Sequence, residues 1–212
     1  PAQALVESGA EPEPYQARAD DIAFIQYTSG STGNPKGVAL THANLLANLR
    51  AMERVVQASP RDVFVSWLPL YHDMGLIGAW LGALYVGYAL VVMSPLAFLA
   101  RPSRWLQAMH RHRGTLSAAP NFAFELCLKR IGDDEIAGLD LSAWRLAFNG
   151  AEPVSPDTVQ RFALRFAVCG FRPETMAPVY GLAECCLGLL FPPLGRAPLI
   201  DRVQRDAFTR EG

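Results

Sequence analysis

The most chemically suggestive part of the chain is residues 27–37, YTSGSTGNPKG, where glycines and small hydroxyl side chains precede a single lysine. Loops of this composition expose backbone N–H groups, which bind phosphate together with hydroxyls and a lysine ammonium. In a Walker A loop the lysine follows a glycine and precedes Ser or Thr, whereas Lys36 lies between Pro35 and Gly37. The segment is therefore predicted to be a different kind of phosphate-binding loop.

The residues that follow Lys36 are GVAL, which favours extended structure rather than the helix that follows a Walker loop. We therefore expect a strand–loop–strand element in which loop amides, hydroxyls and Lys36 hold the phosphates. A glycine-rich loop of this kind can close over a triphosphate. An ordinary surface hairpin rich in turn residues is the alternative interpretation.

The composition is that of a folded globular domain that acts on small molecules. The chain has 212 residues, of which 50% are hydrophobic, and a formal net charge of −1. This is enough apolar material for a sizeable core. The balanced charge provides no basic surface for nucleic acid and no acidic tail, so nucleic acid is not an expected partner.

The ends and the cysteines indicate a cytoplasmic setting. Residues 1–20 lack a secretory signal and are expected to form a linker or arm. The cysteines show no CxxC spacing, which argues against zinc and against a disulfide framework. Adjacent Cys185 and Cys186 leave a strained vicinal disulfide open, but free core thiols are the favoured interpretation.

One segment, Leu76 to Met93, carries no charged side chain and approaches the roughly 20 residues that span a bilayer. Gly87 divides it into a helical part and a β-branched part, YALVVM. A core helix followed by a buried parallel strand is therefore expected rather than a transmembrane segment.

Apolar periodicity along the chain predicts strands that alternate with helices, and hence an α/β domain with largely parallel sheets and flanking helices. Ligands of such sheets bind at the carboxyl ends of the strands. The expected strands are 22–28, 38–40, 63–68, 88–93, 115–119, 144–149 and 176–180. The expected helices begin at Thr41 as N-cap, cover 76–86, run from Pro102 to Gly114, cover 121–129, and run from Ser155 to near Gly170.

Motif-like loops follow several of these strands. They are YTSGSTGNPKGV from Tyr27, LPLYHDMGL from Leu68, APNFAFELC from Ala119, NGAEPV from Asn149 and VYGLAE from Val179. In order and approximate spacing they resemble the adenylate-forming (AMP-binding) superfamily, and they look most like its fatty acyl-AMP ligase branch. The resemblance covers Asp21 to the end of the chain. It implies that residues 21–212 are part of an N-terminal AMP-binding domain whose C-terminal domain is absent here.

The resemblance implies ATP- and Mg²⁺-dependent activation of a fatty acid to fatty acyl-AMP. The acyl group would then pass to the phosphopantetheine thiol of an acyl carrier protein, free or within the same polypeptide, in lipid, polyketide or lipopeptide biosynthesis. The alternatives are an acyl-CoA synthetase and an incomplete fragment that only binds nucleotide or acyl chain. Relatives supply a lysine from the C-terminal domain and a downstream ribose-binding aspartate, so this piece alone is expected to adenylate poorly or not at all.

The resemblance also implies residue roles. Tyr180 resembles the ring that stacks on adenine, beside Gly181, and His72 lies where relatives place a side chain near the acyl carboxylate. Lys36, Glu184 and His72 are the expected catalytic residues, and Glu184 is the expected Mg²⁺ ligand. The β- and γ-phosphates are assigned to Thr28, Ser29, Gly30, Ser31, Thr32, Gly33 and Lys36. The loop that lines the other side of the base and the acyl entrance is assigned to Asn149, Gly150, Ala151, Glu152 and Pro153.

Three points stay open. Asp73 either orients His72 or caps the following helix. Ala183 stands where many relatives carry Thr or Ser, which removes a hydroxyl donor and is interpreted as a subfamily feature. The acyl chain needs an apolar tunnel. The candidate lining residues of this tunnel are Phe122, Phe124, Trp80 and Leu76. Each of them is expected to be a core residue, so none is counted as a site residue.

Overall fold

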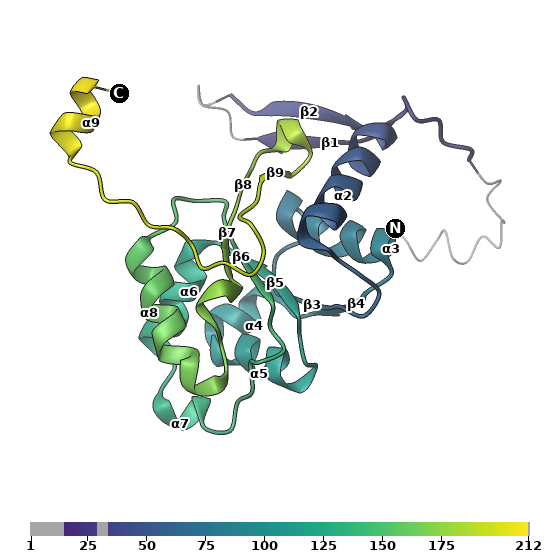
Figure 1. The fold of residues 1–212 in the computed structure, drawn as a ribbon. Helices are drawn as coiled ribbons and strands as arrows, with labels where there is room; N and C mark the ends of the chain where they lie inside the picture. The colour runs from purple at the N-terminus through teal and green to yellow at the C-terminus, as the bar shows by residue number, and fades with distance from the viewer. Residues whose placement is uncertain (1–14, 29–33, 212) are drawn as a thin grey trace.

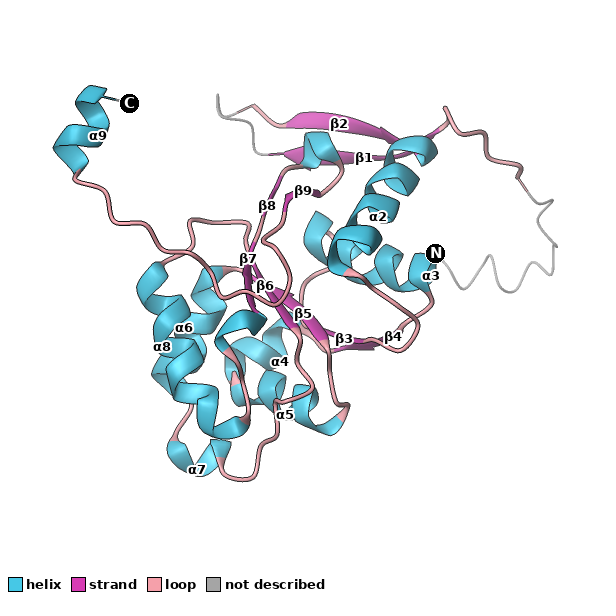
Figure 2. Ribbon diagram, in the orientation of Figure 1, coloured by secondary structure: helices cyan, strands magenta, loops and turns pink. Residues whose placement is uncertain are grey.

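The computed structural model describes residues 15–28 and 34–211, and its centre is a five-stranded parallel sheet with helices on both faces (Figures 1 and 2). The strand order is β4-β3-β5-β6-β7, and all neighbouring pairs are parallel. The α/β prediction with a largely parallel sheet is thus confirmed. The strands are β3 (Val63–Ser66), β4 (Ala89–Val92), β5 (Leu116–Ala119), β6 (Leu146–Asn149) and β7 (Met176–Pro178).

The side of the sheet on which each successive strand is added reverses after β4. The chain runs from β3 to β4 at one edge, then crosses to β5 on the other side of β3 and continues to β6 and β7. Because parallel crossovers are right-handed, this reversal places the helices before and after β4 on opposite faces. The first face carries η1 (Met74–Leu81), which has π-helical turns, and α3 (Gly82–Val86). The other carries α4 (Pro95–Ala100), α5 (Ser103–Arg111), α6 (Asn121–Arg130), α7 (Asp133–Ile136) and α8 (Pro156–Phe166).

The N-terminal strands form a separate antiparallel hairpin, in which β1 (Ile22–Thr28) pairs with β2 (Lys36–Thr41). This confirms the expected strand–loop–strand element. Helix α2 (His42–Val56) follows at once, and Thr41 is its N-cap as predicted. The Thr41 hydroxyl accepts from Asn44 N–H, and the Asn44 side chain accepts from Thr41 N–H, so two backbone donors of the first turn are satisfied.

Several elements differ from the sequence expectations. The helix expected over 76–86 begins at Met74 and is largely π-helical. Helices α4 and α7 were not expected. The same is true of the second small antiparallel pair and of the last helix, which are β8 (Tyr180–Gly181), β9 (Gly188–Leu190) and α9 (Arg205–Glu211). Short 3-10 turns also cover Ala167–Cys169, Pro173–Thr175 and Ala183–Cys185.

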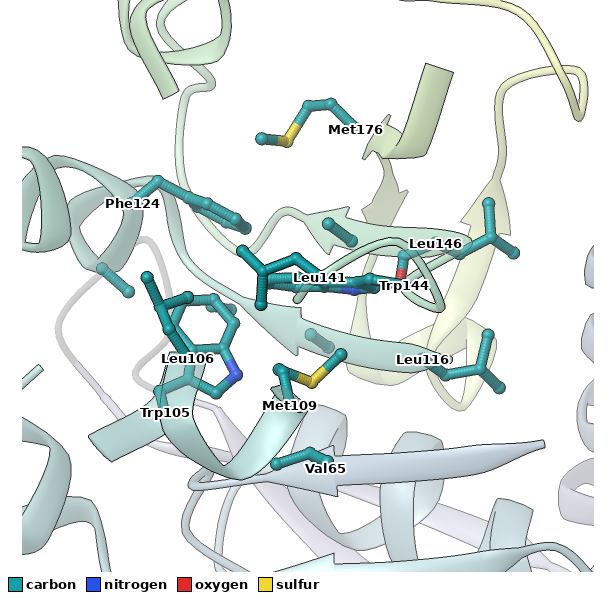
Figure 3. Close-up of a cluster of buried hydrophobic side chains, with 14 of the residues drawn as sticks. Val65, Trp105, Leu106, Met109, Leu116, Phe124, Leu141, Trp144, Leu146 and Met176 are labelled. Atoms are coloured by element: carbon teal, nitrogen blue, oxygen red, sulfur yellow. The ribbon is translucent and has the colours of Figure 1, made fainter. Parts of the chain in front are cut away.

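The main core lies between the sheet and the helices α5, α6 and α8 (Figure 3). Trp105 and Trp144 are fully buried and meet edge to face, with ring centroids 5.3 Å apart. Phe124 packs against Trp105 at 5.4 Å, and Trp105 Nε1 donates to Ser117 Oγ. Removing one such buried ring costs about 3–5 kcal/mol, so this aromatic cluster is a major source of stability on that face.

A polar network joins the amino-terminal ends of three strands. Asp62 precedes β3, and its carboxylate accepts hydrogen bonds from the Arg145 guanidinium at 2.7 and 2.9 Å and from Thr115 Oγ1 at 2.7 Å. Arg145 also donates to the carbonyl of Val56 at the end of α2. Burial opposes ionisation of Asp62, but hydrogen bonds from Arg145, Thr115 and Ser59 outweigh it and lower the pKa.

Two further expectations were tested by the fold. The segment Leu76 to Met93 forms helix and parallel strand as predicted, and no helix in the described part of the chain is long and apolar enough to cross a membrane. All four cysteines are free thiols, and Cys185 is the one that is not fully buried. The expected arm, residues 1–20, lies mostly outside the described residues.

Candidate active site

Three of the five predicted motif loops, those that begin at Leu68, Asn149 and Val179, meet at the carboxyl-terminal edge of the parallel sheet. Four of the predicted site residues, His72, Ala151, Tyr180 and Gly181, line one cavity there, together with Asp73. Its volume is about 280 Å³. These loops follow β3, β6 and β7, and the switch point of the sheet lies between β3 and β5. The crevice at such a switch point is where open α/β sheets bind ligands.

His72 and Asp73 are held together at this edge. His72 Nδ1 lies 2.8 Å from Asp73 Oδ1, and the same oxygen accepts from Met74 N–H at 2.7 Å. Asp73 thus both orients His72 and caps the start of η1, so both open interpretations of Asp73 hold. The Asp73 hydrogen bond raises the pKa of His72 although burial opposes it. With Nδ1 engaged, Nε2 is the nitrogen left for a ligand.

The loop 149–153 is fixed by contacts to the start of α6. Phe122 N–H donates to Glu152 Oε1 at 2.5 Å, and Asn149 Nδ2 donates to Asn121 Oδ1 at 3.2 Å. Ala151 adopts a left-handed conformation with φ of 67°. A Cβ at Gly150 would lie 2.8 Å from the carbonyl oxygen of Val179, the residue after β7, so only glycine permits this close approach.

The contacts of this loop divide its residues into two groups. Ala151 lines the cavity. The Glu152 side chain instead accepts the N–H of Phe122, at the start of a helix whose N-cap residue, Pro120, supplies no side-chain acceptor. Asn149, Gly150 and Pro153 are not among the residues that line the cavity. Their expected role beside the base and the acyl entrance stays a prediction.

Tyr180 and Glu184 lie in the segment after β7. Tyr180 is 55% exposed and borders the cavity, and a ring there is available for stacking. Glu184 is exposed in a short 3-10 turn, and among residues 15–28 and 34–211 it makes no hydrogen bond or ion pair. Ala183 is buried, at 6% exposure.

Within the described residues no three His, Cys, Asp or Glu side chains come close enough to hold a metal ion. A single carboxylate such as Glu184 fits Mg²⁺ only where substrate phosphates supply the other ligands, which is the usual arrangement for Mg²⁺ in nucleotide sites. The donor set therefore suits a magnesium–nucleotide complex rather than a protein-only metal site.

The phosphate-loop prediction falls largely on residues that the structure does not describe. Ser29, Gly30, Ser31, Thr32 and Gly33 lie outside the described residues. The two ends of the loop are described: Thr28 pairs with Lys36 across the hairpin, and Thr28 Oγ1 donates to the Lys36 carbonyl at 3.4 Å. Lys36 is exposed, and neither residue is part of the cavity wall.

The apolar wall of the cavity comes from residues that the sequence analysis did not assign to a site. Phe124 lies in the main core, and Phe122, Trp80 and Leu76 are likewise absent from the described wall. The wall is built from α2, from one face of the sheet, from η1 and α3, from Tyr88 just before β4 and from the segment after β8. Its large apolar members are Leu49, Met52, Val56, Phe64, Val86, Tyr88, Leu116, Phe148, Leu187 and Phe191.

Two signals pointed to part of this wall. Leu49, Met52 and Val56 are spaced three and four residues apart on α2, which is the sequence spacing of one apolar helix face. Phe64 and Leu116 are neighbours in the sheet, and Leu116 alternates with Ser117, whose hydroxyl faces Trp105 in the main core. Side chains in these strands therefore divide between the core and the cavity.

Comparison with known proteins agrees with this geometry. The sequence model of a family described as AMP-binding enzyme matches residues 2–206. The medium-chain-fatty-acid–[acyl-carrier-protein] ligase TtuA of Teredinibacter turnerae is 51% identical over 182 residues, which are 86% of this chain and 28% of TtuA. The long-chain-fatty-acid–AMP ligase FadD23 of Mycobacterium tuberculosis is 45% identical over 184 residues, 84% of this chain and 32% of FadD23.

Among solved structures, the fatty acyl-adenylate ligase from L. pneumophila in complex with acyl adenylate and pyrophosphate superposes with a TM-score of 0.84. It is 45% identical, and the match covers 87% of this chain and 33% of that structure. The chain therefore spans about one third or less of the length of these relatives.

Proposed function

Because this chain belongs to the family of AMP-binding enzymes, we propose that it carries the nucleotide and acyl sites of a fatty acyl-AMP ligase. In the proposed reaction a carboxylate oxygen of a fatty acid attacks the α-phosphate of ATP, which forms acyl-AMP and releases pyrophosphate. The acyl group then passes to the phosphopantetheine thiol of a carrier protein, with release of AMP. The names of the relatives TtuA and FadD23 support this substrate class.

The observation that carries the proposal is the apolar cavity whose mouth is polar. His72 and Tyr180 are exposed and Asp73 is half-buried, and we call this side of the cavity its mouth; Phe64, Leu116 and other buried apolar side chains form the walls. A fatty acid has the same polarity, with one anionic end and an apolar chain. Burying each methylene of that chain contributes about 0.8 kcal/mol, so such a cavity favours an acyl chain over a polar acid.

The mouth supplies groups for the carboxylate and the base. Nε2 of His72, as part of an imidazolium favoured by Asp73, would attract the acyl carboxylate. Tyr180 and the backbone around Gly181 and Ala151 border the mouth where adenine would stack. Binding of carboxylate and nucleotide at one edge of the sheet would lower the entropic cost of their reaction.

The hairpin β1–β2 is the proposed holder of the phosphates. Lys36 supplies a cation, and residues 28–33 supply hydroxyls and backbone N–H groups. Charge builds up on the phosphates as pyrophosphate leaves, and a lysine placed there stabilises it. The exposed Lys36 side chain has no competing ion pair among the described residues.

Mg²⁺ is the proposed metal, and Glu184 its proposed protein ligand. When bound, the ion would neutralise phosphate charge during transfer to the carboxylate. Glu184 is exposed, follows the strand that ends beside the nucleotide site, and has no protein partner in the described regions. Its carboxylate therefore needs no prior bond to be broken before it binds the metal.

The proposal is tested by ATP–pyrophosphate exchange with the whole protein. Exchange should depend on a fatty acid and on Mg²⁺, and amino acids or short hydrophilic acids should not replace the fatty acid. Exchange that is driven equally by a polar acid would overturn the assignment of the cavity to an acyl chain. Absence of exchange with any acid, in a protein shown to bind ATP, would overturn the adenylation reaction itself.

A further inference from the structure

Tyr88 lies at the end of the cavity opposite the mouth. It directly precedes β4. Because Ala89 pairs with Val63, Tyr88 is level with Asp62, at the amino-terminal ends of β3 and β4. The mouth residues Ala151 and Tyr180 follow the other ends of the strands. Strands here are four residues long, so the two ends are separated by roughly 13 Å at about 3.3 Å per residue.

The Tyr88 side chain crosses the space between the sheet and the helices η1 and α3. Its hydroxyl donates to the carbonyl of Gly78 at 3.3 Å, and its ring stacks on Phe64 with centroids 6.1 Å apart. A Cβ at Gly82 would lie 2.6 Å from the Tyr88 hydroxyl oxygen. The glycine at 82 therefore makes room for the phenol against the helix.

Tyr88 is fixed in this position. It is 8% exposed, and the hydrogen bond to Gly78 satisfies its only donor. Burial, together with the nearby charge of Asp62, raises the pKa of the phenol, so the hydroxyl stays protonated and keeps this bond. Rotating the ring away would leave a buried hydroxyl without a partner, which is unfavourable.

We propose that Tyr88 sets the maximum length of the acyl chain and that the preferred substrate is a straight fatty acid of medium length. This rests on the proposed function, in which the cavity holds the chain. The cavity volume of about 280 Å³ is slightly below the low end of the range for ligand pockets, about 300 Å³, which favours a chain of medium length over a long one. A longer chain has to displace the Tyr88 ring or pass the part of the wall that includes Glu53 and Val56.

The test uses Tyr88→Ala in the whole enzyme and compares kcat/KM for octanoate, decanoate, laurate, myristate and palmitate. The kcat/KM of the wild type should decline for fatty acids longer than laurate. Tyr88→Ala should raise the palmitate-to-octanoate ratio about tenfold or more, since each methylene in an apolar pocket changes discrimination by roughly 10-fold or more. Tyr88→Phe keeps the ring and should keep the wild-type profile. Tyr85→Ala is the matched control, because Tyr85 lies on α3 outside the cavity wall.

An unchanged length profile in Tyr88→Ala, with an active wild type, overturns the inference about Tyr88 and leaves the proposed function standing. If Tyr88→Ala does not fold, Tyr88→Leu carries the same test, because it shortens the side chain and keeps the site apolar. The inference is also wrong if Tyr85→Ala shifts the profile as far as Tyr88→Ala. A wild type that uses no fatty acid of any length overturns the proposed function as well.

Discussion

His72 Nδ1 lies 2.8 Å from Asp73 Oδ1, and both side chains border the mouth of the cavity. The same Asp73 oxygen accepts from the Met74 N–H, so the start of η1 and the direction of the imidazole are fixed together. Local sequence thus sets the position of a titratable group at the edge of the parallel sheet. In the proposed reaction this group meets the acyl carboxylate.

The first prediction concerns pH. The hydrogen bond to Asp73 raises the pKa of His72, so the imidazolium is retained below that raised pKa and lost as pH rises through it. The KM for fatty acid should therefore increase several-fold between about pH 6 and pH 9. This range extends upward from the ordinary histidine pKa of about 6.5 because the shift is upward. His72→Asn should show a high KM with little pH dependence. Asp73→Asn should move the wild-type transition to lower pH; an unshifted transition would contradict the role of Asp73.

Lys36 should be needed for the transfer step. Lys36→Ala is expected to lower fatty-acid-dependent pyrophosphate exchange about 100- to 1,000-fold, which is the usual loss when one donor to a developing anion is removed. Lys129→Ala is the matched control, because Lys129 lies on α6 in a surface ion pair with Glu125. Equal exchange rates in the two variants would exclude Lys36 from the phosphate site.

Glu184 should control the magnesium requirement. Glu184→Gln removes one negative ligand, and the Mg²⁺ concentration for half-maximal exchange is expected to rise about tenfold. Glu174→Gln provides the control, since Glu174 pairs with Arg172 on the surface. EDTA should abolish exchange in wild type, and Mg²⁺ should restore it. An unchanged Mg²⁺ dependence in Glu184→Gln would assign the metal to other ligands.

Glu152 should act through the shape of its loop. Its Oε1 accepts from Phe122 N–H, and a glutamine Oε1 can accept the same bond. Glu152→Gln is therefore expected to keep the wild-type KM for ATP, whereas Glu152→Ala should raise it several-fold, because losing one such bond costs about 1 kcal/mol. Loss of ATP binding in Glu152→Gln would instead show that the negative charge itself is required.

The Asp62–Arg145 pair should contribute to stability. Asp62→Asn leaves Arg145 without its carboxylate in a largely buried site, which is expected to lower the free energy of unfolding by about 3 kcal/mol. The pKa of Asp62 is lowered in the fold, so its contribution is present above the unfolded pKa and is lost as pH falls through the folded value.

Urea unfolding at several pH values measures this effect. Wild type should lose stability toward acid more steeply than Asp62→Asn. Asp140→Asn, which removes the partner of Arg113 from an exposed ion pair, should change the unfolding midpoint much less. Equal midpoints for the Asp62 and Asp140 variants would contradict the structural role of the buried pair.

Long periodic elements were predictable from the sequence. The sequence of α2 shows both an N-cap residue and an apolar face. Strands β5 and β6 coincide with short apolar runs, each of which ends at a motif loop. Elements without a local period were missed. Residues Tyr180 and Gly181 form a strand only because they pair with Leu190 and Gly188, which no short-range pattern indicates. Helix α4 had a local signal, Ser94 before Pro95, that the sequence analysis did not use.

The site was predictable at its polar end and not at its apolar end. His72, Ala151 and Tyr180 were assigned to the site because their loops resemble motifs of the AMP-binding superfamily. Tyr88 and Phe64 were not, because apolar residues of a cavity wall have the same sequence pattern as core residues. Only the packing of η1 and α3 over the sheet distinguishes them, and that packing depends on close approach at Gly82.

One measurement tests the central claim most directly: the fate of a radiolabelled fatty acid offered to the whole protein with ATP, Mg²⁺, and equal concentrations of holo acyl carrier protein and coenzyme A. We predict transient acyl-AMP followed by label on the carrier protein, with little acyl-CoA. Efficient formation of acyl-CoA would contradict the assignment to carrier-directed ligases, and the absence of labelled acyl-AMP would contradict fatty-acid adenylation.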